Sequence, residues 1–243
     1  MFILLRKRDI FCTALVCGLF ALFSSAIFQD LSQPVPVFGV QNEGITMTAV
    51  IDPGHGGEDG GAVSDSGVQE SHINLAVSLR LEQLLRFVGQ PTIMTRREDV
   101  STCDEGLGTV KARKASDLRN RVALVNATEN AVLLSIHQNS LPSSKVTHGA
   151  QVFWNTREGA EELALCVQEV MNLWINGGNE KNAKSIPQTI YLMKNAQAPA
   201  ILVECGFLSN SAETAQLQEP AYQTKIAAAV AAGYLRCLKG EGP

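Results

Sequence analysis

Two histidines and two glutamates lie in or beside short apolar runs, where the sequence places few other charged groups. His55 lies in the glycine-rich segment VIDPGHGGEDGGAV, and His137 directly follows the apolar run AVLLSI. Glu70 opens a helical pattern, and Glu204 lies inside PAILVECGFLSN. Two imidazoles and one carboxylate are the ligand type of a catalytic zinc ion that keeps one coordination position for water. We therefore predict a Zn²⁺ site formed by His55, Glu70 and His137.

Each member of this set also has a structural alternative. His137 could cap a strand, and Glu70 could favour the positive N-terminal end of its helix. His55 could belong to a phosphate-binding turn, although neither common glycine-rich nucleotide-binding pattern is present. His72 competes with Glu70 as a ligand, because residues two apart on a helix do not share a face. His148 lies in a polar segment and is expected to face solvent.

Glu204 is the residue whose position most needs an explanation. A carboxylate in an apolar strand costs several kcal/mol unless it is paired, hydrogen-bonded or close to a cation. Strand alternation sends the neighbouring Cys205 to the opposite face. If Glu204 faces the reacting water, it can accept a proton from that water and pass it to a leaving amine. An ion pair with Arg96 or Arg119 is the alternative.

The five glycines around His55 predict an unusual backbone path in that segment. Glycine costs backbone entropy unless the chain needs a positive φ or a close approach to another group. We expect these glycines to let the chain turn sharply after the first strand and present His55 to the metal. Glu58 and Asp59 could orient His55 from behind, or they could be solvated loop acids.

Alternating apolar runs and helical patterns predict the elements that position these residues. We expect a single α/β domain with a mixed, mainly parallel sheet and helices on both faces, as in phosphorylase/hydrolase-like folds. In such sheets ligands collect beyond the carboxyl ends of the strands. The predicted strands cover residues 48–52, 91–96, 131–136, 149–154, 189–193 and 200–205. The predicted helices cover residues 71–88, a segment capped by Ser116, residues 163–174 ended by Gly177 and Gly178, and residues 222–238.

The N-terminal segment indicates export. Arg6, Lys7 and Arg8 precede an uncharged apolar run over residues 10–28. We expect residues 1–28 to be a signal peptide or a membrane anchor, residues 29–46 a linker, and residues 47–240 the catalytic domain. Both outcomes for the leader place the domain outside the cytoplasm. The formal net charge of −4 gives no electrostatic footprint for nucleic acid.

Four cysteines follow the leader, far apart in the sequence and without a C-x-x-C pair. This spacing argues against a cysteine zinc site. Buried free thiols are the expected state, and a disulfide in an exported protein is the alternative. These cysteines are Cys103, Cys166, Cys205 and Cys237.

Four motifs together resemble those of a known enzyme family. VIDPGHGGEDGGAV, QESHINLAV, LLSIHQNS and AILVECGFLSN are similar, in order and spacing, to motifs of the zinc-dependent N-acetylmuramoyl-L-alanine amidases of the amidase-3 family. The resemblance covers residues 48–238 and implies that His55, Glu70 and His137 bind zinc and that Glu204 is catalytic. It also implies peptidoglycan as substrate, cut between the lactyl group of N-acetylmuramic acid and L-alanine.

A further segment, SDLRNRVALVNA, resembles the germination-specific subgroup of this family. The subgroup implies a role in spore cortex maturation, with muramic-δ-lactam formation, and a lipoprotein or other regulatory partner. Some relatives carry an autoinhibitory helix where residues 155–189 show only one amphipathic helix and a polar loop, so we expect an uncovered site. A zinc peptidase and a non-catalytic, metal-stabilised wall-binding module are the alternative functions.

Overall fold

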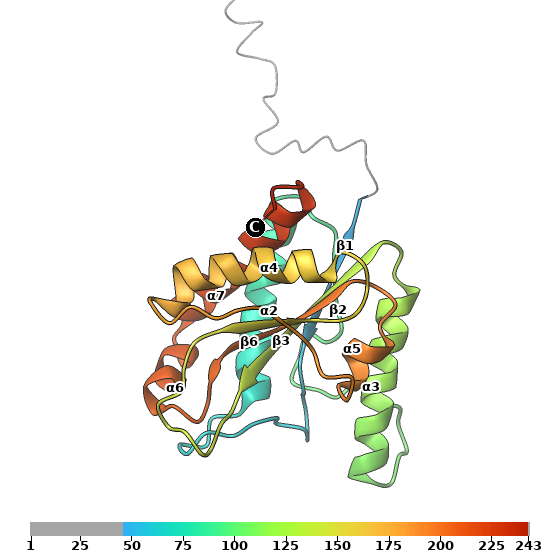
Figure 1. Cartoon of the computed structure of the whole chain (residues 1–243). Coiled ribbons are helices and arrows are strands. Elements are labelled where there is room, and N and C mark those ends of the chain that lie inside the picture. Colours follow the sequence, from blue (N-terminus) through green and yellow to red (C-terminus); the bar gives the residue numbers. More distant parts are fainter. Residues whose placement is uncertain (1–45, 243) are drawn as a thin grey trace, which may run out of the picture. The chain divides into compact units, whose positions relative to one another are not determined.

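The protein, represented by a computed structural model, is described over residues 46–242 and contains one six-stranded sheet there (Figure 1). The predicted leader at residues 1–28 and nearly all of the predicted linker lie outside the described residues. The strands follow the order β2-β1-β3-β6-β4-β5, in which β4 runs antiparallel to β6 and the other pairs are parallel. They are β1 (Thr48–Pro53), β2 (Thr92–Met94), β3 (Ala131–Asn139), β4 (Gln151–Trp154), β5 (Lys184–Ser185) and β6 (Ala200–Phe207).

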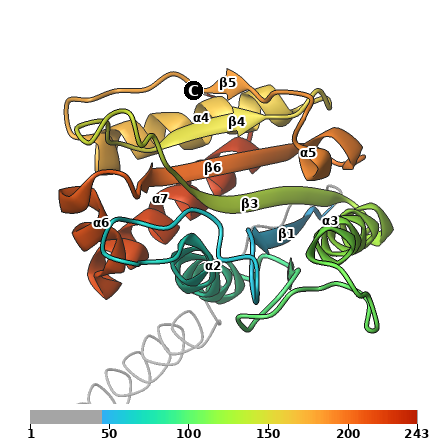
Figure 2. The same cartoon turned by 90° about the horizontal axis from the view of Figure 1, so that it is seen from below.

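Helices cover both faces of this sheet, which confirms the predicted architecture (Figure 2). α2, α4 and α7 pack on one face, and α3 and α5 pack on the other. The helices are α2 (Glu70–Phe87), α3 (Val110–Ala127), α4 (Ala160–Met171), α5 (Tyr191–Asn195), α6 (Ser211–Gln218) and α7 (Pro220–Leu238), and a π-helical turn, η1 (Asn172–Asn176), continues α4.

The alternation of side chains along β3 and β6 decides which residues meet. Cys205 belongs to the core under α2, α4 and α7, whereas Leu133 and Leu202 belong to the core under α3 and α5. Because side chains alternate along a strand, His137 and Glu204 lie on the same face as Leu133 and Leu202. The prediction that Glu204 and Cys205 point to opposite faces is therefore confirmed.

The prediction of a strand over residues 189–193 is wrong, because this segment contains α5. Leu192 and Met193 are adjacent in the sequence, and both are buried in the core under α3 and α5. A strand would send them to opposite faces, whereas a helical turn lets both pack on the same side. Periodicity cannot separate these outcomes in so short an apolar run.

The helix predicted to begin at Ser116 begins earlier, at Val110. The Thr109 side chain caps it by accepting a hydrogen bond from the Ala112 backbone N–H at 3.1 Å. Ser116 lies inside the helix, is buried, and donates to Asp104 at 2.7 Å, which ties the preceding loop to α3. The first turns of α3 carry charged side chains and no apolar stripe, so periodicity could not reveal this start.

Smaller differences concern element ends. β3 continues to Asn139, so His137 lies within the strand rather than after it. β5 and α6 were not predicted, because one has only two residues and the other lacks an apolar stripe. Gly177 ends η1 in the left-handed conformation, φ 51°, as expected for a helix stop.

The four cysteines of the described domain are free thiols, and Cys166 and Cys205 are fully buried. The expected state, a buried free thiol, is therefore confirmed for Cys166 and Cys205, whereas Cys103 and Cys237 are free but partly exposed. Within residues 46–242, no helix combines the length and the apolar character needed to span a membrane.

Candidate active site

The fold brings His55, Glu70 and His137 together from three separate elements. One potential ligand atom from each lies within 4.8 Å of the other two. Nε2 of His55 is 3.3 Å from Oε2 of Glu70, and Nδ1 of His137 is 2.9 Å from Oε1 of the same carboxylate. The loop after β1, the first residue of α2 and the end of β3 therefore converge beyond the carboxyl ends of the parallel strands, where ligands are expected.

The electrostatics of this group favour a bound cation. Burial raises the pKa of Glu70, but hydrogen bonds with His137 and His55 outweigh it and hold that pKa well below its usual range. Burial lowers the pKa of His55, but hydrogen bonds with Asp59 and Glu70 outweigh it and raise that pKa to about 9. The Asp59 and Glu70 carboxylates therefore stabilise a positive charge on His55, and a bound metal ion would take the place of that proton. This donor set can bind a metal ion.

Two glycines allow the backbone to approach the ligand group closely. A Cβ added to Gly54 would lie 2.2 Å from Cε1 of His137, closer than real contacts permit. A Cβ added to Gly61, which has φ +69°, would lie 2.5 Å from Oε2 of Glu70. The glycine-rich segment thus fits tightly around the imidazole and carboxylate groups, as its composition predicted.

Asp59 holds the far side of the His55 ring. Its Oδ2 lies 3.0 Å from Nδ1 of His55, which leaves Nε2 of that ring directed to Glu70. The same Oδ2 is 3.0 Å from Nζ of Lys114 on α3. Glu58 instead forms a bidentate ion pair with Arg113, with hydrogen bonds of 2.6 and 2.7 Å. Of the two loop acids, Asp59 therefore contacts His55 and Glu58 does not.

The other two histidines lie away from the ligand group. His72 is 60% exposed and pairs with Asp99 at 3.0 Å, so Glu70 rather than His72 joins the other ligands. His148 is exposed, as expected, and contacts the backbone carbonyl of Val146.

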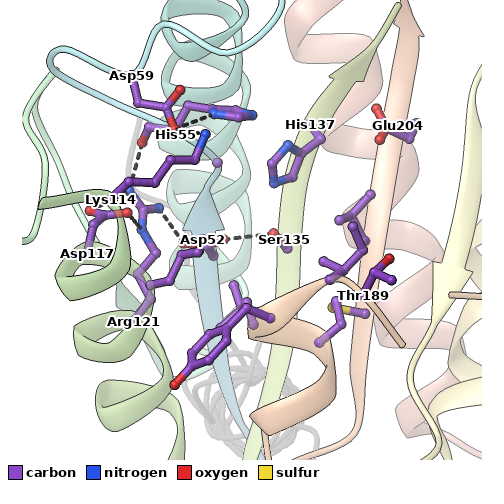
Figure 3. A pocket seen from close by; sticks show the side chains of 17 residues that line it. Asp52, His55, Asp59, Lys114, Asp117, Arg121, Ser135, His137, Thr189 and Glu204 are labelled. Carbon is purple, nitrogen blue, oxygen red and sulfur yellow. Dashed lines mark hydrogen bonds and ion pairs between the residues drawn. The ribbon is translucent and has the colours of Figure 1, made fainter. Parts of the chain in front are cut away.

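Glu204 is the direct cross-strand neighbour of His137 in the parallel β3–β6 pair, and both side chains line one pocket (Figure 3). Its Oε2 atom is buried without a hydrogen-bond partner, and burial raises the pKa of the carboxyl group to about 7. Arg96 donates to backbone carbonyls at the start of the glycine-rich loop, and Arg119 is exposed. The alternative ion pair is therefore not formed, and Glu204 lines the pocket with no hydrogen-bond partner at Oε2.

The pocket has a volume of about 350 Å³ and lies between the sheet, α3 and α5. The candidate ligands His55 and His137, together with Glu204, lie along it (Figure 3). Lys114, Asp117 and Arg121 come from α3, and an apolar wall comes from α5. Such a site can place a polar substrate beside both a metal ion and a basic carboxylate.

Comparison with known proteins identifies the family. Residues 49–236 match the Amidase_3 family, described as N-acetylmuramoyl-L-alanine amidase. The chain belongs to this amidase family. The family resemblance drawn from the four motifs is thereby confirmed, and the match covers every element from β1 to α7.

Named relatives of this amidase include a germination-specific protein. The chain is 38% identical over 195 residues to the germination-specific N-acetylmuramoyl-L-alanine amidase of Bacillus subtilis (strain 168). This alignment covers 79% of this chain and 81% of that protein. The CwlD amidase of Clostridioides difficile, solved in complex with the GerS lipoprotein, superposes with a TM-score of 0.76 at 34% identity, covering 80% of this chain and 99% of that one. The catalytic domain of CwlV from Bacillus (Paenibacillus) polymyxa gives a TM-score of 0.67 at 27% identity, covering 79% and 98%.

Sequence reasoning missed Asn74, which positions Glu70 in this amidase. The buried Asn74 amide donates to Oε1 of Glu70 at 3.2 Å and to the backbone carbonyl of Gly54 at 3.1 Å. It also accepts from the Gln138 side chain, whose backbone N–H donates to Oε1 of Glu70 at 3.0 Å. The available signal was an asparagine four residues after Glu70, on the same face of the predicted helix.

Arg121 is the second missed residue, and it holds the chain beneath His55. Its guanidinium pairs with Asp52 at 2.7 Å and Asp117 at 2.8 Å, and it donates to the backbone carbonyls of Pro53 and His55. Burial raises the pKa of Asp52, but the Arg121 charge and the hydrogen bonds from Thr95 and Ser135 together outweigh it and lower that pKa to about 2. An arginine within the apolar stripe of a predicted helix was the available signal.

We expect Arg121→Met to lower the free energy of unfolding by about 3 kcal/mol, because it leaves the buried Asp52 carboxylate without its cation. Urea unfolding measures this loss. Arg119→Met is the matched control on the same helix. It should change the free energy of unfolding by less than about 0.5 kcal/mol because Arg119 is exposed. Equal losses in the two variants would contradict the structural role of Arg121.

Proposed function

We propose that this chain is a zinc-dependent peptidoglycan hydrolase that cleaves the amide between the lactyl group of N-acetylmuramic acid and L-alanine of the stem peptide. The observation that carries the proposal is the convergence of His55, Glu70 and His137, with Glu204 on the adjacent strand. We assign the first three residues as zinc ligands and Glu204 as the catalytic residue. Membership in the amidase family supports the bond that is cut.

The donor set fits zinc. Two imidazole nitrogens and one carboxylate oxygen leave one position of a tetrahedral ion open, as catalytic zinc sites do. When bound, zinc supplies polarisation of the scissile carbonyl and a lower pKa for the attacking water. Within this arrangement Asp59 fixes the His55 ring and Asn74 fixes the Glu70 carboxylate, so both ligands are held in place before substrate arrives.

Glu204 moves the proton in this proposal. Its carboxylate accepts a proton from the attacking water and then donates that proton to the nitrogen of L-alanine as the amide bond breaks. The free oxygen Oε2 has no competing partner within the described domain. A pKa near neutrality, raised by burial to about 7, suits a group that must act first as a base and then as an acid.

The test is digestion of purified peptidoglycan with and without added zinc, followed by fragment masses. The proposal expects intact stem peptides that begin with L-alanine, released only when metal is present. Fragments cut within the stem peptide would favour a zinc peptidase instead. Binding of peptidoglycan without any release would favour the wall-binding module, which needs a fourth protein ligand to close its metal site.

We expect kcat/KM to fall on the acid side of neutrality, about tenfold per pH unit, because Glu204 must be ionised to accept the proton. The midpoint should lie between the ordinary glutamate value of 4.5 and the value of about 7 that burial sets, since a bound cation lowers the pKa. A pH–rate profile on soluble muropeptides measures it. A rate that rises as the pH falls from 7 to 5 would remove Glu204 from the basic step.

The biological setting is proposed from the relatives. We place residues 1–28 as a signal peptide or membrane anchor, residues 29–46 as a linker and residues 47–240 as the catalytic domain, acting outside the cytoplasm. The named germination-specific relative supports a role in spore cortex maturation, and the CwlD–GerS complex supports a lipoprotein partner. Digestion of cortex-type against vegetative peptidoglycan, with and without such a partner, tests this setting.

A further inference from the structure

The pocket continues beyond Glu204, and its two walls differ in chemistry. Lys114 extends from α3 toward His55 on one side (Figure 3). The opposite wall is mainly apolar and is formed by α5, the two residues before it and β6. A ligand that fits here carries a small apolar group on one side and a negative charge on the other. The apolar wall consists of Ile190, Tyr191, Leu192, Met193 and Leu202.

Lys114 is the pocket-lining cation that has donors left for a ligand. Its Nζ is 3.0 Å from Oδ2 of Asp59, which takes one of the three N–H donors, and its side chain is 53% exposed. Arg121, the other cation of the lining, is buried and already donates to Asp52, Asp117 and two backbone carbonyls. Of the two cations, Lys114 is therefore the one that an anionic ligand can reach, beside the Asp59 and Asp117 carboxylates that also line the pocket.

Lys114 lies close enough to the metal ligands to reach a specific part of a stem peptide bound there. Nδ1 of His55 and Nζ of Lys114 both lie 3.0 Å from Oδ2 of Asp59, so the two nitrogens are at most about 6 Å apart. In a stem peptide, the second residue is a glutamate joined through its γ-carboxyl group, so its α-carboxyl group is free. That group lies about one to two residue lengths, roughly 3.5 Å each, beyond the scissile nitrogen.

We propose, on the basis of the proposed function, that the pocket between α3 and α5 receives the first two residues of the stem peptide and that Lys114 binds the free α-carboxylate of the second. The methyl group of L-alanine packs against the α5 wall. Lys114 is then a specificity-determining residue that distinguishes an α-carboxylate from an α-carboxamide at that position. Lys114 can still donate a hydrogen bond to the carbonyl oxygen of a carboxamide, but the carboxamide lacks the negative charge and forms no ion pair with it.

The experiment compares two synthetic glycan–peptide substrates that differ only in this group, one with the α-carboxylate and one with the α-carboxamide. With zinc-loaded protein, kcat/KM should be about tenfold higher for the carboxylate substrate. In Lys114→Met the ratio should fall to about one. Absolute rates of this variant can fall on both substrates, because Lys114 also contacts Asp59, so the ratio is the readout. Lys111→Met, on the same helix, exposed and outside the pocket lining, should keep the original ratio.

A ratio near one in the unmodified protein, a preference for the carboxamide, or an unchanged ratio in Lys114→Met would each overturn the assignment of Lys114. These outcomes leave the proposed function intact as long as stem peptides are released. Failure to release peptide from either substrate and from purified peptidoglycan would instead contradict the proposed function.

Discussion

Glu204→Gln is expected to reduce the release of stem peptides by about 10³-fold while leaving the fold unchanged and the three metal ligands in place. General acid–base catalysis by a positioned carboxyl group contributes 10²- to 10⁴-fold, and an amide can neither accept nor return the proton. Because Glu204 is the cross-strand neighbour of His137 and shares no hydrogen bond with the ligand group, its replacement removes no ligand. Peptide release and zinc content of the purified variant are the measurements.

The unfolding temperature of Glu204→Gln distinguishes a loss of catalysis from a folding defect. Burial raises the pKa of Glu204 to about 7, so the fold favours the neutral form of the side chain. A neutral glutamine of the same shape should therefore unfold at the same temperature as the unchanged protein or at a higher one. Glu162→Gln, an exposed change on α4, serves as the matched control with full activity. Unaltered turnover in Glu204→Gln would remove this carboxylate from the mechanism.

The sequence revealed the candidate site because its members are polar residues in apolar surroundings. His137 and Glu204 interrupt two buried strands, and strand alternation alone places each on one face of the sheet. What alternation could not give is the pairing of β3 with β6, which makes these two residues neighbours. That pairing depends on contacts between segments that lie about 65 residues apart in the chain. Such contacts cannot be predicted from the local pattern of a single sequence.

The missed features share a different cause. Asn74 and Arg121 donate to the backbone carbonyls of Gly54 and His55, and every residue type has such a carbonyl, so the sequence does not indicate which one is bound. The residues of α5 were assigned to a strand because a short apolar run fits either element. In each case the deciding interaction is tertiary. Local sequence patterns therefore predicted the candidate site residues, but not all of the tertiary interactions that hold those residues in place.

Gly61→Ala is expected to lower the affinity for zinc by about 10- to 100-fold, with a matching loss of activity at limiting metal. The added Cβ would lie 2.5 Å from Oε2 of Glu70 and 2.7 Å from Cδ2 of His55, so at least one of these side chains must move. Glu70 is fixed by backbone N–H groups of Ala62 and Gln138 and cannot shift without breaking hydrogen bonds. Zinc titration of metal-depleted protein against a chromophoric chelator measures the affinity without relying on catalysis.

Gly67→Ala separates the steric effect at Gly61 from backbone strain. Gly61 and Gly67 have φ values of +69° and +82°, so alanine is strained at both positions, but a Cβ at Gly67 meets no atom within 4 Å. Backbone strain should therefore cost each variant about 1 kcal/mol of unfolding free energy, and Gly61→Ala should lose more because its Cβ also displaces Glu70 or His55. Only Gly61→Ala should lose metal affinity, because only that Cβ enters the space of Glu70 and His55. Equal zinc affinities in the two variants would show that the glycine-rich segment is needed for its turn and not for its close approach to the metal ligands.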